Sequence, residues 1–521
     1  MKKSFMAQTS LKLAALLGSV TLALTACVPQ GTPSASSESA KDMTTTQAAA
    51  SSLPAAPAGL ENFYGQKPTW SKCGNLECAT VEVPMDYANP GGKRISIAIN
   101  RLKASGSAQG SILVNPGGPG ASGVDLVESG SAMFSTTLKK NFNIVGFDPR
   151  GISRSEPVKC LTDKERDAEA ADNTGPAKTA AYMDHVEKHV KEYTAKCKEN
   201  SGEILAFVDT ESSARDLDIL RDALGDSKLN YLGYSYGTKL GATYAGLYQD
   251  RTGRLVLDGA MDPSLSEQEI TLGQAKGFEK AITAYLQNCL KNSNTCPFTG
   301  SVDNARQELI HLMNTVIDAP VPTNSGRDVS ITQFVNGFIT PFYEPSLWPM
   351  LSLALKDVLD SDNGDTILAL ADASSGRQDN GTYKGNQEDA FNAVNCLDYP
   401  RGTTRDQMMA EYDQLVAASP VLGKYLAFGG FMCDNWPAPE RVKPAPASAD
   451  NAAPIVIIGT TGDPATPYEW AQALRQQLKT STLVTYQGNG HTAYGRSNSC
   501  ITDAVDKYFV DGTVPADGLK C

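Results

Sequence analysis

Histidine is scarce in this chain, with four residues in 521. No C-x-x-C pair is present and no histidine cluster completes a zinc site, so we expect no metal ion and no cofactor. Positive charge is also in short supply, because 46 lysines and arginines face 58 acidic residues and leave a formal net charge of −12. A surface this acidic argues against nucleic acid as a partner. These absences leave a class of proteins whose chemistry rests on side chains alone.

The chain also lacks an apolar run of membrane-spanning length at its start. Residues 13–26 are apolar and follow three lysines, but they are too short to cross a bilayer comfortably, which is typical of a signal peptide at residues 1–26. The run ends Leu24-Thr25-Ala26-Cys27, a lipobox-like sequence. We therefore expect Cys27 to be lipidated and to hold the protein on the outer face of a membrane, or the protein to be secreted if the signal is an ordinary one.

Residues 27–60 contain mostly Ser, Ala, Thr, Pro and Gln, with too little apolar content to fold. We predict a disordered tether whose root-mean-square reach is roughly 30 Å. Removal of residues 1–26 takes away three lysines and no acids, which changes the formal charge from −12 to −15.

Ten cysteines remain when Cys27 is set aside, and an even number in an exported protein indicates disulfides. Each cysteine has a neighbour within the same local segment, so proximity predicts sequential pairing. The predicted pairs are Cys73 with Cys78, Cys160 with Cys197, Cys289 with Cys296, Cys396 with Cys433, and Cys500 with Cys521.

The pentapeptide at 233–237, Gly-Tyr-Ser-Tyr-Gly, follows the apolar run 229–232 and precedes a helix-like stretch. A strand that turns sharply into a helix needs glycine on both sides of the turn, because a side chain there would collide with its neighbours. Such a turn exposes the hydroxyl of Ser235 and suits a nucleophile. A G-x-S-x-G sequence also occurs by chance, so the flanking strand and helix carry the prediction.

A serine nucleophile needs a base, and the four histidines differ in context. His185 and His189 lie in a stretch rich in lysine and glutamate that predicts a solvated helix face, and His311 lies in an amphipathic helix pattern. His491 instead follows a strand-like run and a glycine-rich turn, late in the chain. We predict His491 as the general base.

An acid is expected between the nucleophile and the base. Asp463 follows the compact apolar strand 454–459, so it lies on a loop beyond the carboxyl end of a strand. From there a carboxylate can fix the tautomer of the imidazole and stabilise the imidazolium. Gly-Asp-Pro alone is an ordinary turn. The order Ser235, Asp463, His491 nevertheless predicts a catalytic triad.

The sequence at 111–120, Ser-Ile-Leu-Val-Asn-Pro-Gly-Gly-Pro-Gly, predicts a strand that runs into a glycine-rich loop. Such a loop can aim a backbone amide at a developing negative charge. It lacks the lysine of a phosphate-binding loop and the glycine spacing of a dinucleotide fingerprint. We predict an oxyanion hole formed by the amides of Gly118 and Tyr236, with Gly117 an almost equal alternative to Gly118.

Strand-like runs alternate with helical segments from residue 111 onward, which indicates an α/β fold with a mostly parallel sheet and helices on both faces. Nearly 200 residues separate the strand near 257 from the strand near 455, more than a crossover requires, so they must form an inserted, mainly helical cap. The predicted division is a core at 61–261, a cap at 262–442 and the rest of the core at 443–521.

Together with Gly-Phe-Asp-Pro-Arg-Gly at 146–151, these motifs resemble those of the secreted tripeptidyl aminopeptidase-type α/β-hydrolases of actinobacteria, with proline iminopeptidases as more distant relatives. The resemblance runs from about residue 60 to the C-terminus. It implies an α/β-hydrolase fold and an exopeptidase that releases short peptides from a free amino terminus. For Asp148 and Arg150, which match a family motif, we favour a structural role in bracing the oxyanion loop.

An aminopeptidase must bind a substrate ammonium, which favours a carboxylate in the cap. The candidates are Glu344, Asp398 and the adjacent pair Glu388 and Asp389, each of which is otherwise a surface acid or a helix cap. The sequence thus predicts a monomeric serine peptidase that acts on peptides with a free N-terminus. The alternative is a lipid-anchored carboxylesterase or lipase with the same triad, and a binding lipoprotein is a more remote one.

Overall fold

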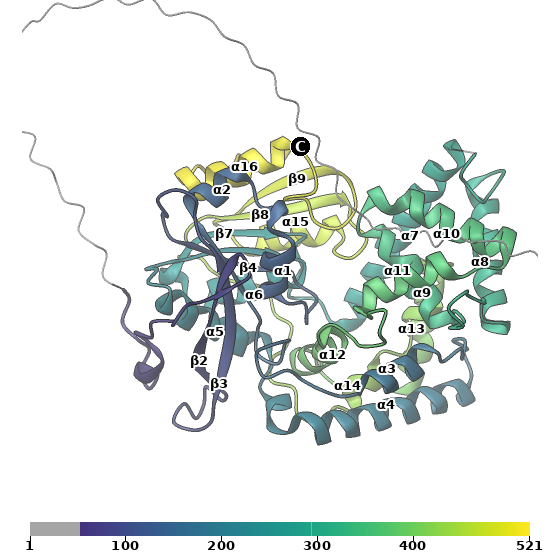
Figure 1. Ribbon diagram of the computed structural model, residues 1–521, viewed down its shortest axis with the longest axis horizontal. Coiled ribbons are helices and arrows are strands. Elements are labelled where there is room, and N and C mark those ends of the chain that lie inside the picture. Colours follow the sequence, from purple (N-terminus) through teal and green to yellow (C-terminus); the bar gives the residue numbers. More distant parts are fainter. Residues whose placement is uncertain (1–52, 293) are drawn as a thin grey trace, which may run out of the picture. The chain divides into compact units, whose positions relative to one another are not determined.

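The computed structural model describes residues 53–292 and 294–521 (Figure 1). The predicted signal peptide, Cys27 and most of the predicted tether lie outside the described residues. Within the described part, no helix combines the length and the apolar character needed to cross a bilayer.

A mixed ten-stranded sheet in this part of the chain has the order β1-β2-β3-β5-β4-β6-β7-β8-β9-β10. Strands β1 to β3 pair antiparallel, β3 meets β5 antiparallel, and every pair from β5 to β10 is parallel. The sheet thus matches the predicted α/β fold. Its strands are β1 (Ser71–Cys73), β2 (Leu76–Pro84), β3 (Arg94–Leu102), β4 (Ser111–Asn115), β5 (Asn143–Phe147), β6 (Leu229–Tyr234), β7 (Thr252–Asp258), β8 (Ile455–Gly462), β9 (Thr482–Asn489) and β10 (Leu519–Lys520).

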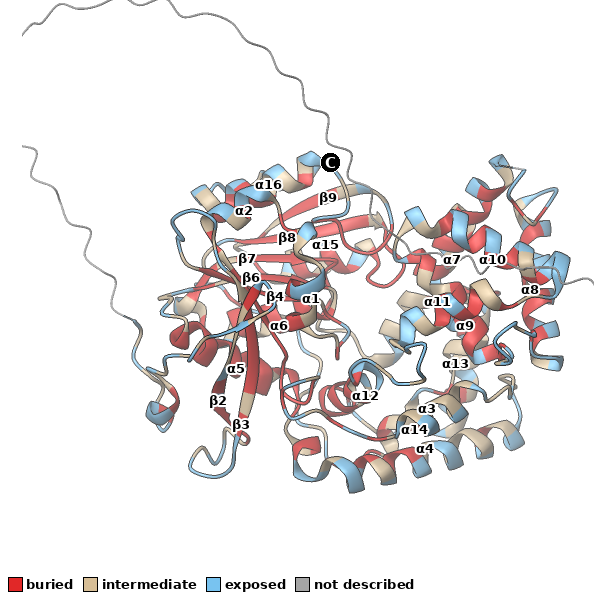
Figure 2. Ribbon diagram, in the orientation of Figure 1, coloured by how far each residue is buried: buried red, intermediate tan, exposed pale blue. Residues whose placement is uncertain are grey.

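The central strands are buried on both faces, because successive side chains of a strand point to opposite sides. In β6, Leu229 and Tyr231 enter one apolar core, whereas Leu232 and Tyr234 enter the other. Figure 2 shows these strands as a buried layer. The apolar runs of the sequence therefore become strands that need helices on both sides.

Two sets of helices supply that cover. Helices α5 (Thr210–Ala223), α6 (Tyr236–Leu247) and α15 (Tyr468–Gln477) contribute to the core on one face. Helices α1 (Gly123–Ser129), α2 (Thr136–Asn141) and α16 (Ser499–Asp511) contribute to the core on the other. The result is three layers, with the loops after β4, β6, β8 and β9 at the carboxyl edge of the sheet.

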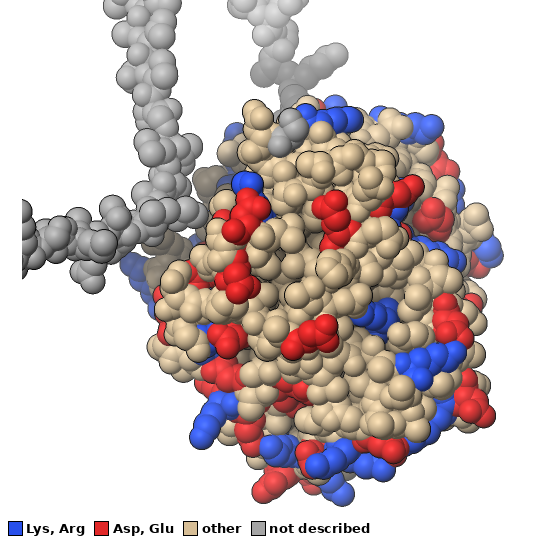
Figure 3. All heavy atoms as spheres, turned by 90° about the vertical axis from the view of Figure 1, so that its right-hand side faces the viewer, with Lys and Arg blue, Asp and Glu red and all other residues tan. Residues whose placement is uncertain are grey.

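The cap follows β7 and ends before β8, and most of it has an apolar core of its own. Acidic and basic side chains are interspersed on the face of the molecule seen in Figure 3. The cap helices are α7 (Glu267–Lys291), α8 (Val302–Asp318), α9 (Ile331–Ile339), α10 (Trp348–Ser361), α11 (Asp365–Ser375), α12 (Gln387–Asp398), α13 (Arg405–Ala418) and α14 (Gly430–Asp434).

The structure differs from the predicted division in the segment between β5 and α5. Its helices α3 (Asp163–Ala170) and α4 (Ala180–Ser201) lie beside α12 and α14 rather than on the sheet (Figure 1). Met183 of α4 joins Met408, Phe428 and Phe431 of the cap in one apolar cluster. The charged composition of α4 concealed this contact, since a single stripe of apolar residues carries it.

The predicted tether is shorter than 27–60 at its C-terminal end. Leu60 is 6% exposed and belongs to the core, because it begins the short helical turn over Phe63. The carbonyl of Ala55 accepts a hydrogen bond of 2.8 Å from Arg251. Residues 53–60 are thus attached to the folded domain.

The described residues contain five disulfides, and each joins the two cysteines that proximity pairs in the sequence. Cys160–Cys197 ties the start of the α3–α4 segment to the end of α4. Cys396–Cys433 ties α12 to α14. The first bridge thus closes the α3–α4 segment, and the second holds two helices of the cap together.

Arg150 is fully buried just after β5, and every one of its five N–H groups has an acceptor. Its guanidinium binds both carboxylate oxygens of Asp216, at 2.7 and 2.6 Å. The remaining donors reach the backbone carbonyls of Pro84, Met85 and Phe207. Arg150 therefore joins β2, β5 and α5 from within the core, rather than bracing the glycine loop.

We expect Arg150→Met to lower the free energy of unfolding by about 3–5 kcal/mol, because Asp216 would remain buried without its partner. Urea denaturation followed by circular dichroism would measure the loss. The matched control is Arg475→Met, which breaks an exposed two-contact pair with Asp517 and should cost about 0–1 kcal/mol. Equal losses in the two variants would contradict this account.

Candidate active site

Ser235 lies at the sharp junction between β6 and α6. Its φ of 55° is unusual for a residue other than glycine. A Cβ on Gly233 would stand 2.4 Å from the carbonyl oxygen of Gly237, and one on Gly237 would stand 2.8 Å from the side chain of Asn115. Both glycines are thus required by close contact. The side chain of Ser235 is half-buried between buried neighbours and does not cap α6, so its hydroxyl is free to react.

Asp463 and His491 are in direct contact. Nδ1 of His491 lies 2.9 and 3.0 Å from the two carboxylate oxygens of Asp463, and both residues are buried. The carboxylate also accepts hydrogen bonds from three backbone amides, those of Ala465, Thr466 and Thr492. With Nδ1 donating to the carboxylate, Nε2 is the nitrogen left to accept a proton.

The nucleophile and the base both lie next to the end of β7. The amide of Ser235 donates to the carbonyl of Asp258 at 2.9 Å, and a Cβ on the next residue, Gly259, would lie 3.3 Å from Cε1 of His491. Within the described residues, the Ser235 hydroxyl has no hydrogen bond to the imidazole. Such bonds in hydrolases often tighten only when substrate is bound.

A second carboxylate that the sequence analysis overlooked holds the histidine loop. Asp258 ends β7, is fully buried and accepts hydrogen bonds from the amides of Ala493 and Tyr494, at 3.0 and 2.7 Å. Burial raises the pKa of Asp258 to about 6, although these two amides act in the opposite direction. Its signal in the sequence was its place at the end of β7, the strand next to the one that leads into the nucleophile.

The glycine loop lies against the nucleophile. A Cβ on Gly117 would come within 2.8 Å of the Ser235 side chain. The amide of Gly117 donates to Asn115 at 2.9 Å, so it is already used, whereas the amide of Gly118 has no acceptor within the described residues. Tyr236 begins α6, where the first amides have no partner inside the helix. Between Gly117 and Gly118, the hydrogen bonds thus favour Gly118 as the donor.

Asp148 secures the far end of this loop. It accepts hydrogen bonds from the hydroxyl of Ser122, from the amide of Val124 and from Arg154. Ser122 is the N-cap of α1 and follows the loop directly. Asp148 therefore has the bracing role that the sequence analysis favoured for it and for Arg150.

The structure contradicts the proposed substrate contact of Asp398. Asp398 is fully buried and forms an ion pair of 2.8 Å with Lys239 of α6. It also accepts hydrogen bonds from the amide and hydroxyl of Thr210, at 3.0 and 2.5 Å. Burial alone would lower the pKa of Lys239, but the carboxylate raises it above its usual value. The carboxylate of Asp398 is thus already paired with Lys239 in the core, a partner that the sequence pattern did not reveal.

Glu344 does lie close to the base. Its neighbour Tyr343 accepts a hydrogen bond of 2.9 Å from the amide of His491, and the two rings pack edge to face. Glu344 is half-buried and borders a cavity of about 120 Å³ together with His491 and Arg496. This space is less than a third of the volume of the cavity described next.

A larger cavity of about 430 Å³ lies between α3, α4, α9 and α12, and its lining includes three acids, Glu169, Asp172 and Glu388, and the cation Arg166. Burial and the nearby carboxylates of Glu388 and Asp389 raise the pKa of Glu169 to about 7. Glu388 is exposed, and the residue before it, Gln387, contacts Gly120 of the glycine loop. Glu388 is thus one residue along the chain from a contact with the glycine loop.

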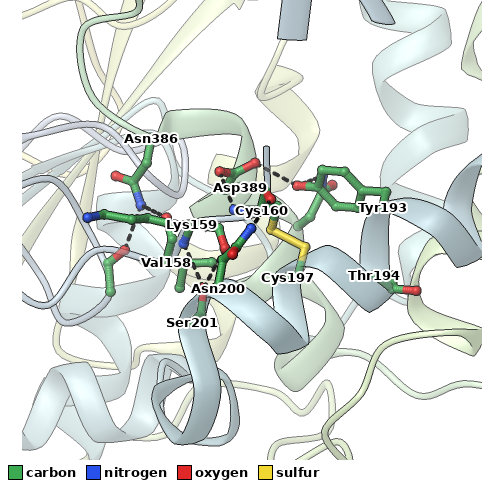
Figure 4. Close-up of a disulfide and its surroundings, with 12 residues drawn as sticks. Val158, Lys159, Cys160, Tyr193, Thr194, Cys197, Asn200, Ser201, Asn386 and Asp389 are labelled. Atoms are coloured by element: carbon green, nitrogen blue, oxygen red, sulfur yellow. Dashed lines mark hydrogen bonds between the residues drawn. A yellow bond between two sulfur atoms is a disulfide. The ribbon is translucent and has the colours of Figure 1, made fainter. Parts of the chain in front are cut away.

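Asp389 is occupied by structural contacts. It binds Arg166 at 2.7 Å. It also accepts hydrogen bonds from the hydroxyl of Tyr193 at 2.9 Å and from the amide of Cys160 at 3.0 Å (Figure 4). Asn386 bonds the carbonyls of Gly151 and Val158. These contacts fix the start of α12, and therefore the position of Glu388, against the segment that carries the Cys160–Cys197 disulfide.

Comparison with known proteins agrees with this architecture. A family model described as alpha/beta hydrolase fold matches residues 110–300, and one described as TAP-like protein matches residues 419–521. Serine protease Hip1 of Mycobacterium tuberculosis is 36% identical over 490 residues, which cover 88% of this chain and 92% of that protein. The tripeptidyl aminopeptidase of Streptomyces coelicolor is 31% identical, with 87% and 84% covered.

The chain belongs to the tripeptidyl aminopeptidase-like family of α/β-hydrolases. The family resemblance and the fold predicted from the sequence are thereby confirmed, and the protein is an enzyme, a serine hydrolase. A third relative, of the same organism as Hip1, is named carboxylesterase B and is 36% identical, with 87% of each chain covered. The hydrolase family therefore includes members named for peptide and for ester substrates.

Replacement of Asp398 tests its reassignment from substrate contact to core. We expect Asp398→Ala to lower the free energy of unfolding of this hydrolase by about 3–5 kcal/mol, because Lys239 would be left buried and unpaired. Urea denaturation measures the loss. The double variant Lys239→Met with Asp398→Leu should recover most of the stability and keep the wild-type KM. A raised KM in the double variant, at wild-type stability, would return Asp398 to the substrate site.

Proposed function

We propose that this hydrolase is an aminopeptidase that releases short peptides, of the tripeptidyl type, from free N-termini through Ser235, Asp463 and His491. The observation that carries the proposal is the contact between the buried Asp463–His491 pair and the strand end that also holds Ser235. The peptidases among the relatives support a peptide substrate.

In the proposed mechanism, Nε2 of His491 takes the proton of the Ser235 hydroxyl as its oxygen attacks the carbonyl carbon of a peptide bond. Asp463 stabilises the imidazolium that results. The amides of Gly118 and Tyr236 hold the oxyanion, and each such donor is worth roughly 3 kcal/mol when tested by deletion. His491 then protonates the leaving amine, and water releases the acyl group by the same path in reverse.

The larger cavity supports a site for the substrate ammonium. Two of the acids that line it, Glu169 and Glu388, repel each other, and burial together with this repulsion raises the pKa of Glu169. An ammonium group between them would relieve the repulsion and gain charge-assisted hydrogen bonds. Three extended residues reach roughly 10 Å, so an ammonium held at some distance from Ser235 suits release of a tripeptide.

Glu344 remains the alternative ammonium ligand. Because it lies beside His491, it would place the substrate's N-terminus close to the scissile bond and would suit removal of fewer residues. Glu344 and the pair Glu169 and Glu388 would therefore specify products of different lengths.

We further propose that lipidated Cys27 anchors the enzyme to the extracytoplasmic face of a membrane. The support for this lies in the sequence of residues 1–27 and in the disulfides, which persist in oxidising compartments. Two or more acyl chains give a lasting anchor, since each buried methylene contributes about 0.8 kcal/mol.

The second candidate function is a carboxylesterase with the same triad. The relative named carboxylesterase B favours it, because its identity to this chain equals that of the peptidase Hip1. An esterase needs no carboxylates placed for an ammonium, so the two functions differ in their need for Glu169 and Glu388.

Paired substrates test the proposed reaction. A tripeptidyl anilide with a free amino terminus should be cleaved, whereas its acetylated form should be cleaved far more slowly, since it offers no ammonium. Ser235→Ala should lower kcat on the order of 10⁶-fold. Equal turnover of both peptides would exclude an ammonium site, turnover of a p-nitrophenyl ester alone would favour the esterase, and activity retained by Ser235→Ala would refute the nucleophile.

Charge removal in the cavity locates the ammonium site. We expect Glu388→Gln, which keeps size and hydrogen bonding, to lower kcat/KM for the free-terminus peptide about 10- to 100-fold, mainly through KM, and to leave ester hydrolysis unchanged. The matched control is Glu344→Gln, for which little change is expected. The reverse pattern would assign the ammonium to Glu344, and a loss of ester hydrolysis in Glu388→Gln would indicate structural damage.

A further inference from the structure

His185 and His189 lie one turn apart on α4, with ring centroids 4.3 Å apart. The sequence analysis assigned both to a solvated helix face and expected no metal. In the structure, Asp172 from the loop after α3 meets this pair, with its carboxylate 3.1 Å from Nε2 of His185. One ligand atom from each of the three residues can be chosen so that all lie within 4.8 Å of one another.

We propose that Asp172, His185 and His189 bind a divalent transition-metal ion of the zinc class. Two imidazoles and a carboxylate are donors that Zn²⁺ accepts, and two histidines at positions i and i+4 of a helix can bind one ion from the same face. Zn–N and Zn–O bonds are about 2.0–2.2 Å long, so the three donors must approach slightly closer together. His189 is exposed, so its side chain has the freedom to make that adjustment.

The surroundings of Asp172 prepare it as a ligand. The amide of Thr174 donates to its other carboxylate oxygen at 2.8 Å, an outer contact of the kind that orients metal-binding carboxylates. The loop around Asp172 is held by α9, through the amide of Ile331 on Asn173 at 2.6 Å and the hydroxyl of Thr332 on the Asp172 carbonyl at 3.2 Å. The carboxylate is therefore fixed in place, and the two histidines come to it from α4.

An ion at this position would link α4 to α9 through the loop of Asp172. These helices lie far apart in the sequence and line the same cavity of about 430 Å³ as Glu169 and Glu388. Three protein ligands would leave a fourth position for water. The ion would thus stabilise the wall of the cavity, and this inference stands without the proposed aminopeptidase activity.

Metal binding is measured on the full chain, purified without a histidine tag and dialysed against chelator. Titration calorimetry with Zn²⁺ should give one ion per chain, and Co²⁺ should give the visible absorption of a low-symmetry site. His189→Ala should weaken binding at least about 10-fold, with the wild-type circular dichroism spectrum. Asp172→Asn should weaken it in the same way.

The matched control is His311→Ala, because His311 is an exposed helical histidine of α8 away from the cluster. We expect this variant to bind the ion as the wild type does. Binding with less than one ion per chain, or equal binding by His189→Ala and the wild type, would overturn the proposal. Zn²⁺ that inhibits hydrolysis and still binds His189→Ala would place the ion at His491 instead, which also overturns it.

Discussion

The turn at Ser235 is the constraint on which the rest of the site depends. A left-handed residue at the end of a buried parallel strand is stable only if both flanking positions lack side chains and if neighbouring elements approach closely. The hydrogen bond from the amide of Ser235 to the carbonyl of Asp258 couples this turn to β7. The packing of Gly117 on the serine couples it to β4. One strained residue thereby sets the positions of both neighbouring strands' loops.

Electrostatic roles in the site are divided between acids that differ in their surroundings. Asp463 accepts hydrogen bonds from three backbone amides besides its contact with the imidazole of His491. Asp258 accepts hydrogen bonds from two backbone amides and thereby holds the loop of His491. Asp398 forms an ion pair with Lys239 of α6. In the part of the chain that the structure describes, the carboxylates of Glu169 and Glu388 in the cap cavity have no hydrogen bond or ion pair, and this difference marks them as groups able to receive a cation from outside.

The sequence predicted those parts of the molecule whose local pattern determines their place. Apolar runs gave the eight long strands, and the glycines around Ser235 gave the turn. The short strands β1 and β10 were not predicted, because two or three residues are too few to show a periodic pattern. The structural role of Asp398 was not predicted either, since its partner Lys239 lies 159 residues away in the sequence. The placement of α3 and α4 rests on tertiary contacts with the cap, for which the charged sequence of α4 offers only a narrow apolar stripe of Met183, Val186 and Val190 as a sign.

The order of the disulfides has a consequence for how the chain acquires its covalent structure. Every bridge joins consecutive cysteines, across separations of 5 to 37 residues, and no bridge encloses a cysteine of another. During synthesis or export from the N-terminus, each cysteine of the folded domain therefore meets its partner before the next pair emerges. With Cys27 set aside, an oxidant that joined each new thiol to the preceding free one would produce the native set directly, without a step of disulfide rearrangement.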